Sequence, residues 1–279
     1  MNELGFACWG MREMPLEAQL EFCGACGVRL TELDIANAPG GLPLDCDAGR
    51  LNEVKRAFER HGMPLWYVAT GNDFTLETDE AVRAQVEKVC RVIELCAQLG
   101  VRWLRIFAGF SPAEEVDGPR MERLLLALSI VCEKAGEKGV CLVLETHGGV
   151  RPCGAGVEHF HSVSTRYDLL KQLLEKSPPD LWFLLDPANL QAAGEDPVRC
   201  YQLLKGRIAY IHAKEFVPLP GGGLRPAGCG AGAFDWAAFF AQIHDFDGPV
   251  MIEYEEPGDV QQGMRESLDL LRRTLQKTE

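Results

Sequence analysis

Four short apolar segments of this sequence end in a side chain that carries, or can carry, a charge. Their last residues are Glu145, Asp186, His212 and Glu253. A charged group at the end of a buried strand needs a partner, because its desolvation is otherwise costly. Three carboxylates and one imidazole that met in one place would repel one another unless a cation joined them. Such an oxygen-rich set with one imidazole suits Mn²⁺, Mg²⁺ or Co²⁺, so these residue types predict a divalent metal site.

Each of these residues also has a plainer interpretation when it is taken alone. Glu145 or Asp186 could cap a helix, and a single histidine such as His212 is more often a hydrogen-bonded core residue. The same feature recurs, however, at the ends of four consecutive apolar runs. This repetition favours a shared metal site over four separate explanations.

Other side chains at strand ends are candidates for contact with a substrate. His147 and Lys214 each stand two residues beyond one of the predicted ligands. The two-residue period of a strand would point both toward the substrate, where His147 could act as an acid or base and Lys214 could hold an anion. Arg105 could also bind an anion, and Trp9 and Trp66 could stack on the apolar face of a sugar. Solvent exposure of the charged residues and core packing of the tryptophans are the alternatives.

These residues need a scaffold that brings the ends of several strands together. Eight short runs rich in Val, Ile, Leu and aromatic residues predict buried parallel strands. They are Leu4–Trp9, Val28–Ile35, Pro64–Ala69, Val101–Phe107, Val140–Glu145, Leu181–Asp186, Ile208–His212 and Pro249–Tyr254. Uninterrupted alternation of strands with helices predicts an α/β fold, a single (β/α)8 TIM barrel over residues 1–279. The strand ends of such a barrel converge on the face that carries the active site.

Helical periodicity fills the segments between these runs. The two longest helices are expected at Thr78–Leu99 and Met121–Lys138, where Gly100 and Gly139 provide natural stops. Shorter helices are expected at Pro15–Cys26, Gly49–His61, Tyr167–Lys176, Pro197–Lys205, Trp236–Asp245 and Val260–Lys277. Two long loops rich in glycine and proline, 148–162 and 217–233, follow the fifth and seventh strands and therefore lie on the active face.

Composition and charge exclude several classes of protein. At 47% hydrophobic and 25% charged residues, the chain has an ordinary globular composition rather than a disordered one. Its 28 basic and 41 acidic side chains give a formal charge of −13, which argues against a partner that is a nucleic acid or an acidic membrane. No apolar run approaches the roughly 18 residues of a membrane span, and the start has no signal-peptide pattern.

The eleven cysteines are expected to be buried, reduced thiols, because many lie inside apolar stretches. Cys23-Gly-Ala-Cys26 is the only pair with the Cys-x-x-Cys spacing, and no second pair or neighbouring histidine supports a zinc or redox site there. We therefore expect this pair to be a packed helix end. Together with the missing signal pattern, the reduced thiols predict a cytoplasmic protein.

The motifs at these predicted strand ends resemble those of a known family. The motifs are Leu-Glu-Thr-His at 144–147, Leu-Asp-Pro-Ala-Asn at 185–189, Ile-His-Ala-Lys-Glu at 211–215 and Met-Ile-Glu at 251–253. They are similar to those of the xylose isomerase-like TIM-barrel superfamily and, within it, of the sugar phosphate isomerase/epimerase family. A glycine-rich turn at 228–236 that leads into an Asp-Trp helix start adds to the resemblance, which runs from Leu4 to about Leu271.

The resemblance implies that Glu145, Asp186, His212 and Glu253 hold one divalent ion, usually Mn²⁺, with Mg²⁺, Co²⁺ or Zn²⁺ as alternatives. It implies an isomerase or epimerase that acts on a small sugar, ketose or sugar phosphate. The two glutamates would flank the substrate, so that one removes the proton next to the carbonyl and the other returns it on the opposite face. This chemistry needs a metal-stabilised enediolate. The resemblance is also compatible with a homo-oligomer.

The sequence departs from the epimerase pattern at two places. Asn189, which we also expect to contact the substrate, stands where those enzymes often carry a histidine. Lys214 occupies a region where they tend to have an arginine. The pairing of His147 with Lys214 is at least as similar to the dehydratases of the superfamily, which act on inosose or dehydroshikimate. A dehydratase that uses the same site is therefore the alternative function, and both free and phosphorylated substrates stay open.

Overall fold

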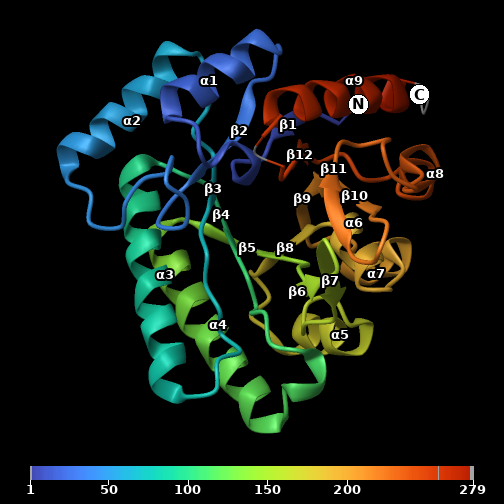
Figure 1. The fold of residues 1–279 in the computed structure, drawn as a ribbon. Coiled ribbons are helices and arrows are strands. Elements are labelled where there is room, and N and C mark those ends of the chain that lie inside the picture. Colours follow the sequence, from blue (N-terminus) through green and yellow to red (C-terminus); the bar gives the residue numbers. More distant parts are fainter. Residues whose placement is uncertain (1, 257, 277–279) are drawn as a thin grey trace.

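The computed structural model describes residues 2–256 and 258–276, and within them eight parallel strands form a closed barrel (Figure 1). The strand order around the barrel is β1-β12-β9-β8-β5-β4-β3-β2, and the ring closes where β1 pairs with β12. The strands are β1 (Leu4–Phe6), β2 (Leu30–Asp34), β3 (Tyr67–Ala69), β4 (Trp103–Ile106), β5 (Cys141–Glu145), β8 (Trp182–Leu185), β9 (Ile208–Ala213) and β12 (Val250–Ile252). The predicted (β/α)8 TIM barrel and its eight strands are confirmed. Met1, Pro257 and residues 277–279 of the predicted domain lie outside the described residues.

Helices cover the outside of the barrel between successive strands (Figure 1). They are α1 (Leu16–Ala25), α2 (Ala48–Arg60), α3 (Asp79–Leu99), α4 (Gly118–Lys138), α5 (Tyr167–Lys176), α6 (Pro187–Ala192), α7 (Pro197–Leu204), α8 (Trp236–Gln242) and α9 (Val260–Gln276), with short 3-10 turns η1 (Trp9–Met11) and η2 (Ala113–Glu115). Of the helices that the structure describes, none has the length and apolar character that a membrane crossing requires.

The two longest helices end at the glycines predicted as stops, whereas α4 begins at Gly118 rather than at the predicted Met121. The Thr78 side chain accepts a hydrogen bond from the backbone at the start of α3, and Asp117 does the same for α4. Gly100 and Gly139 end these helices in the left-handed conformation, with φ of 78° and 69°. The predicted final helix is confirmed up to Gln276, whereas Lys277 lies outside the described residues.

The alternation of side chains along the barrel strands separates an apolar layer from a polar one. Buried Leu30, Tyr67, Val143, Leu184, Tyr210 and Met251 fill the barrel interior as one cluster. Glu145, His212 and Glu253 each follow a member of this cluster by two residues, so they point into the same interior one layer nearer the carboxyl ends. Strand periodicity therefore places the polar groups at the mouth of the barrel.

The expectation of two long irregular loops, at 148–162 and 217–233, is wrong in part. The first contains β6 (Gly149–Cys153) and β7 (Gly156–Phe160), and the second contributes to β10 (Glu215–Pro218) and β11 (Leu224–Ala227). These segments form a four-stranded antiparallel sheet in the order β10-β11-β7-β6, here called the outer sheet (Figure 1). The two hairpins join where Leu224 pairs with Val157. Because that pairing unites segments far apart in the chain, the local glycine and proline content concealed it.

Candidate metal centre and substrate pocket

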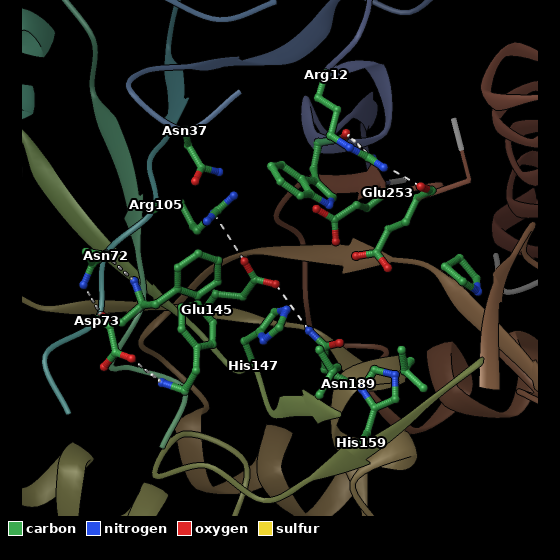
Figure 2. Close-up of a pocket in the computed structure, with 18 of the residues that line it drawn as sticks. Arg12, Asn37, Asn72, Asp73, Arg105, Glu145, His147, His159, Asn189 and Glu253 are labelled. Carbon is green, nitrogen blue, oxygen red and sulfur yellow. Dashed lines mark hydrogen bonds and ion pairs between the residues drawn. The ribbon is translucent and has the colours of Figure 1, made fainter. Parts of the chain in front are cut away.

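The carboxyl ends of the barrel strands open into a pocket of about 590 Å³ (Figure 2). Arg105, Glu145, Asn189 and Glu253 line its deep end. Its walls come from the loops that follow the strands, from α3 and from the outer sheet, and include Trp9, Arg12, Asn37, Gly71, Asn72, Asp73, Gln85, Lys88, Phe107, Phe110, His147, Val150, Val157, His159, Phe216, Pro226 and Glu255. The volume is in the range of roughly 300–1,000 Å³ that is typical of pockets for small organic ligands.

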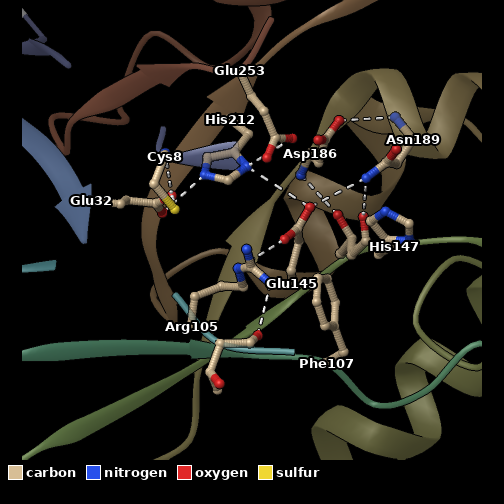
Figure 3. A network of polar contacts seen from close by, with 12 residues as sticks. Cys8, Glu32, Arg105, Phe107, Glu145, His147, Asp186, Asn189, His212 and Glu253 are labelled. Carbon is tan, nitrogen blue, oxygen red and sulfur yellow. Dashed lines mark hydrogen bonds and ion pairs between the residues drawn. The ribbon is translucent and has the colours of Figure 1, made fainter. Parts of the chain in front are cut away.

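The structure brings together the four residues that the sequence singles out as ligands (Figure 3). Glu145, Asp186, His212 and Glu253 are all buried, and each offers one ligand atom within 4.8 Å of the others. They come from the ends of β5, β8, β9 and β12, which are neighbours in the barrel. Among the described residues, this is the group of His, Cys, Asp and Glu side chains whose geometry could hold a metal ion.

The capping interpretation of Asp186 is also correct. Asp186 directly follows β8 and is the N-cap of α6, where its Oδ1 accepts a hydrogen bond of 2.9 Å from the backbone of Asn189. Its Oδ2 makes no hydrogen bond and lies 3.2 Å from the ammonium of Lys214. One carboxylate therefore starts a helix with one oxygen and faces the cluster with the other.

His212 is oriented by Glu32, a residue that the sequence analysis missed (Figure 3). The Nε2 atom of His212 lies 3.1 Å from Glu32 Oε1, and its Nδ1 atom lies 3.4 Å from Glu253 Oε2 and 3.8 Å from Glu145 Oε1. Glu32 also accepts a hydrogen bond of 2.8 Å from the Tyr210 hydroxyl. The available signal was a carboxylate in the middle of a strand, β2, whose five residues are all buried.

Lys214 lies among the carboxylates and is not one of the described residues that line the pocket. Its Nζ atom is 2.7 Å from Glu253 Oε2, 2.9 Å from Glu255 Oε1 and 3.2 Å from Asp186 Oδ2. The strand period does point Lys214 to the side of His212, as expected. The anions that it contacts are side chains of its own chain.

Arg105 is buried in the same network, with its charge matched by Glu145. Its Nε atom lies 3.3 Å from Glu145 Oε2, and it donates a hydrogen bond of 3.0 Å to the backbone oxygen of Thr70. The guanidinium also lies over the ring of Phe107, 4.3 Å from its centroid. Asn189 approaches the other oxygen of Glu145, at 3.4 Å. Both predicted contact residues thus line the pocket and also hold Glu145 in place.

The electrostatics of the cluster fit a divalent cation. The carboxylates in and around it are the buried Glu32, Glu145, Asp186 and Glu253 and the partly buried Glu255, whereas the permanently charged cations are Arg105 and Lys214. Negative charge is therefore in excess. In addition, Glu145 Oε2, Asp186 Oδ2 and His212 Nδ1 are buried and make no hydrogen bond. Three carboxylates and one imidazole are a donor set suited to a divalent metal ion once the imidazole has lost its Nδ1 proton.

The two glutamates of this cluster differ in proton affinity. Burial raises the pKa of Glu145 to about 7, even though Arg105 counteracts the shift. Burial would also raise the pKa of Glu253, but the charges of Lys214 and His212 outweigh it and hold the pKa well below its usual value. The structure therefore places one carboxyl that protonates near neutrality beside one that stays ionised.

His147 lines the pocket as a neutral imidazole. Burial, with a smaller contribution from the charge of Lys214, lowers its pKa to about 3. Its Nδ1 atom lies 2.5 Å from the backbone oxygen of Gly148, which can only accept, so Nδ1 carries the proton. The ring packs edge-on against Phe107 and Phe110, with centroids 5.2 and 5.4 Å away. Its Nε2 atom is left as a hydrogen-bond acceptor rather than a cation.

The two candidate tryptophans have different positions. Trp9 begins η1 after β1 and lines the pocket, with the guanidinium of Arg12 4.8 Å from its ring. The expectation that Trp66 stands at the active end of its strand is wrong. Trp66 precedes β3, is 49% exposed and lies in a surface hollow with Phe58 and Met63. Because the strand starts after it, Trp66 belongs to the opposite end of the barrel.

Comparisons with known proteins agree with this architecture. A family model described as xylose isomerase-like TIM barrel matches residues 20–274. No curated protein sequence matches the chain. The fold is similar to that of the probable 3-DHS dehydratase AsbF, involved in petrobactin synthesis, from Bacillus anthracis, with a TM-score of 0.77 and 16% identity over 98% of this chain and 99% of that one.

Two further solved structures have the same fold along their whole length. One is the IOLI protein with a binding zinc atom, with a TM-score of 0.75 and 18% identity over 100% of this chain and 98% of that one. The other is an L-ribulose 3-epimerase, with a TM-score of 0.74 and 18% identity over 100% of this chain and 96% of that one. At such low sequence identity, the similarity to these solved structures shows a shared fold.

Proposed function

The chain belongs to the xylose isomerase-like TIM barrel family, and from this premise we propose that it is a divalent-metal-dependent isomerase or epimerase. Its substrate would be a small sugar, ketose or sugar phosphate, and the reaction would begin with removal of a proton next to the carbonyl. The observation that carries the proposal is the buried group Glu145, Asp186, His212 and Glu253, two members of which also line the pocket.

Glu145 and Glu253 are proposed as the acid and base of this reaction. Both line the deep end of the pocket, and both lie beside Nδ1 of His212, at 3.8 and 3.4 Å. Their positions support the assignment, because two carboxyl groups at the reacting centre can remove a proton at one group and return it from the other. Arg105 and Asn189 would keep Glu145 oriented through its two oxygens.

The remaining roles concern the metal and the substrate. We propose Mn²⁺ as the ion held by the four side chains, where it would supply a Lewis acid that stabilises negative charge on a carbonyl oxygen. His147 would accept a hydrogen bond from a substrate hydroxyl through Nε2. Trp9 would stack on the apolar face of the substrate, which presents C–H groups. Because the chain's formal charge is −13, a nucleic acid is not proposed as a partner.

A cytoplasmic location forms part of this proposal. All eleven cysteines are free thiols in the described part of the chain, and six of them are buried. Disulfides are rare where glutathione and thioredoxin keep thiols reduced, so unpaired cysteines in this number support a reducing compartment.

The test is proton NMR in D₂O with added Mn²⁺, over a panel of ketoses, ketose phosphates, inosose and dehydroshikimate. We expect deuterium to enter next to a carbonyl and a new sugar isomer to appear. Glu253→Gln should abolish the exchange, whereas Glu137→Gln, a change of an exposed glutamate on α4, should not affect it. Exchange that persists in Glu253→Gln would remove the acid/base assignment, and no exchange with any compound would contradict the proposed reaction.

A dehydratase is the second candidate function, and one observation favours it. His147 lines the pocket two residues beyond Glu145, and its Nε2 could accept a hydrogen bond from the substrate beside the reacting carbons. Of the two glutamates, one would remove the proton next to the carbonyl, and the other would give a proton to the departing hydroxyl group, which leaves as water. The solved structure of the probable 3-DHS dehydratase, which shares the fold, supports this candidate in the same way that the epimerase structures support the first. The same NMR experiment distinguishes them, because a dehydratase would yield olefinic proton signals instead of a sugar isomer.

A further inference from the structure

The outer sheet turns an apolar face toward the pocket and a charged face toward solvent. Val157 and His159 are two residues apart on β7, and His159 pairs with Val150 on β6, so all three share one face. The opposite face carries Arg151 and Glu158, which form an exposed ion pair of 2.8 Å. The sheet is thus amphipathic, and its apolar face is the one that lines the pocket.

The second hairpin of the outer sheet continues the same face. Val157 pairs with Leu224, and Pro226 lies two residues further along β11. Pro226 in turn pairs with Phe216 on β10, so the periodicity places these side chains on one surface. Together with Phe107 and Phe110 from the loop after β4, this surface forms an apolar wall, defined as Phe107, Phe110, Val150, Val157, Phe216 and Pro226.

Most polar side chains on the opposite side of the pocket form hydrogen bonds within the protein. Asn72 donates to the backbone oxygen of Phe107 at 2.7 Å and accepts from its N–H at 2.9 Å. Asp73 accepts from the backbone and the hydroxyl of Thr75, both at 2.7 Å. These groups fix the loops after β3 and β4. The polar groups suited to hydroxyls of a substrate are therefore concentrated at the deep end, beside Glu145 and Glu253.

The apolar wall is open to solvent at its outer end. Val150 is 51% exposed, one of the few large apolar side chains of the described chain with so much exposure. His159 lies beside the wall on the same face of the sheet, and its ring is 4.5 Å from that of Phe216. Both ring nitrogens of His159 are buried and without a hydrogen-bond partner. An apolar surface with one unsatisfied polar group, beside a charged site, is suited to a ligand of mixed character.

We propose that the pocket favours a substrate that carries an apolar ring, attached away from the carbonyl carbon of its polyhydroxy part, over the free monosaccharide. The polyhydroxy part occupies the deep end of the pocket, and the ring packs against the apolar wall. This inference rests on the proposed function and adds the substrate class to it. It also assigns the outer sheet the role of selecting that class.

The experiment compares two matched probes by calorimetry on the Mn²⁺-loaded protein. The probes are phenyl and methyl β-D-glucopyranoside, which differ in the size and apolar character of the substituent. We expect the phenyl glycoside to bind about tenfold more tightly, because only its ring covers the wall. Phe216→Ala and the half-exposed Val150→Ser should remove most of this difference and leave the methyl glycoside unchanged. Ile130→Ala, an exposed apolar position on α4 outside the pocket, is the control.

A phenyl glycoside that binds no more tightly than the methyl glycoside, or does not bind, would overturn the proposal. The same conclusion would follow if Val150→Ser and Phe216→Ala left the preference intact. These outcomes are independent of turnover, because the probes carry no carbonyl. The deuterium-exchange experiment can therefore fail while the preference for the ring is observed, and the reverse can also occur, so that the two proposals are judged separately.

Discussion

Glu32 holds Nε2 of His212 at 3.1 Å, and this contact directs Nδ1 of the same ring toward Glu253 and Glu145. Both side chains are fully buried. Glu32 is itself fixed by the Tyr210 hydroxyl. A carboxylate behind a metal-ligating histidine commonly sets the orientation of the ring and raises its basicity. Glu32 is therefore a positioning residue that acts through His212.

Glu32→Gln should weaken metal binding by about tenfold, because metal sites lose roughly 10- to 100-fold in affinity when such a supporting contact is changed. The glutamine keeps the size of the side chain, so the fold should be retained. Calorimetric titration of the metal-free protein with Mn²⁺ measures the effect. Glu137→Gln, on the exposed face of α4, is the matched control. An unchanged affinity in Glu32→Gln would contradict the role of this contact.

Lys214→Met should destabilise the metal-free protein by on the order of 3 kcal/mol, because it leaves buried carboxylates without their cation. Asp186, Glu253 and Glu255 would then face one another with no ammonium between them. Mn²⁺ should raise the thermal midpoint of this variant more than that of the unmodified protein. Differential scanning fluorimetry with and without Mn²⁺ measures both effects, with Lys138→Met as an exposed control. Equal Mn²⁺ effects on the two proteins would count against the model of a cation-dependent cluster.

Metal affinity should increase with pH. Burial raises the pKa of Glu145 to about 7, and Glu253 and Glu32 raise the pKa of His212 well above its usual value although burial alone would lower it. Both groups must lose a proton to bind a metal, so binding releases protons and strengthens as pH rises from about 6 to about 8. Calorimetry in two buffers of different ionisation enthalpy counts the protons. Constant affinity and no proton release would refute the expectation.

His147 should make the fold sensitive to acid. Its pKa is lowered to about 3 by burial, from a usual value near 6.5, so below pH 6.5 the unfolded chain binds a proton that the folded chain does not. His147 therefore does not lower the free energy of unfolding above pH 6.5. As the pH decreases toward 3, this free energy falls, by about 2 kcal/mol at pH 5.

Guanidinium denaturation at neutral pH and at pH 5 measures this loss. The variant His147→Gln, which cannot titrate, should lose about 2 kcal/mol less than the unmodified protein between the two conditions. His244→Gln, at an exposed position, should behave like the unmodified protein. A loss of equal size in His147→Gln would mean that other groups cause the acid sensitivity.

Much of the fold and part of the site could be predicted from local patterns. The eight strands were predictable because each is a short apolar run and helical periodicity recurs between them, and both patterns are local. The convergence of Glu145, Asp186, His212 and Glu253 followed from the barrel itself, since the ends of its parallel strands meet on one face. Trp66 was misplaced because an apolar run does not reveal which of its residues begins the strand.

The sequence by itself determined the barrel and the residue types at its mouth, since periodicity and strand–helix alternation are properties of neighbours in the chain. Only the tertiary structure decided what those residues face. Glu32 and His212 are 180 positions apart, and the two hairpins of the outer sheet meet through Val157 and Leu224. Lys214 is bound by carboxylates from two other strand ends. Such contacts depend on distances in space, which no local pattern encodes.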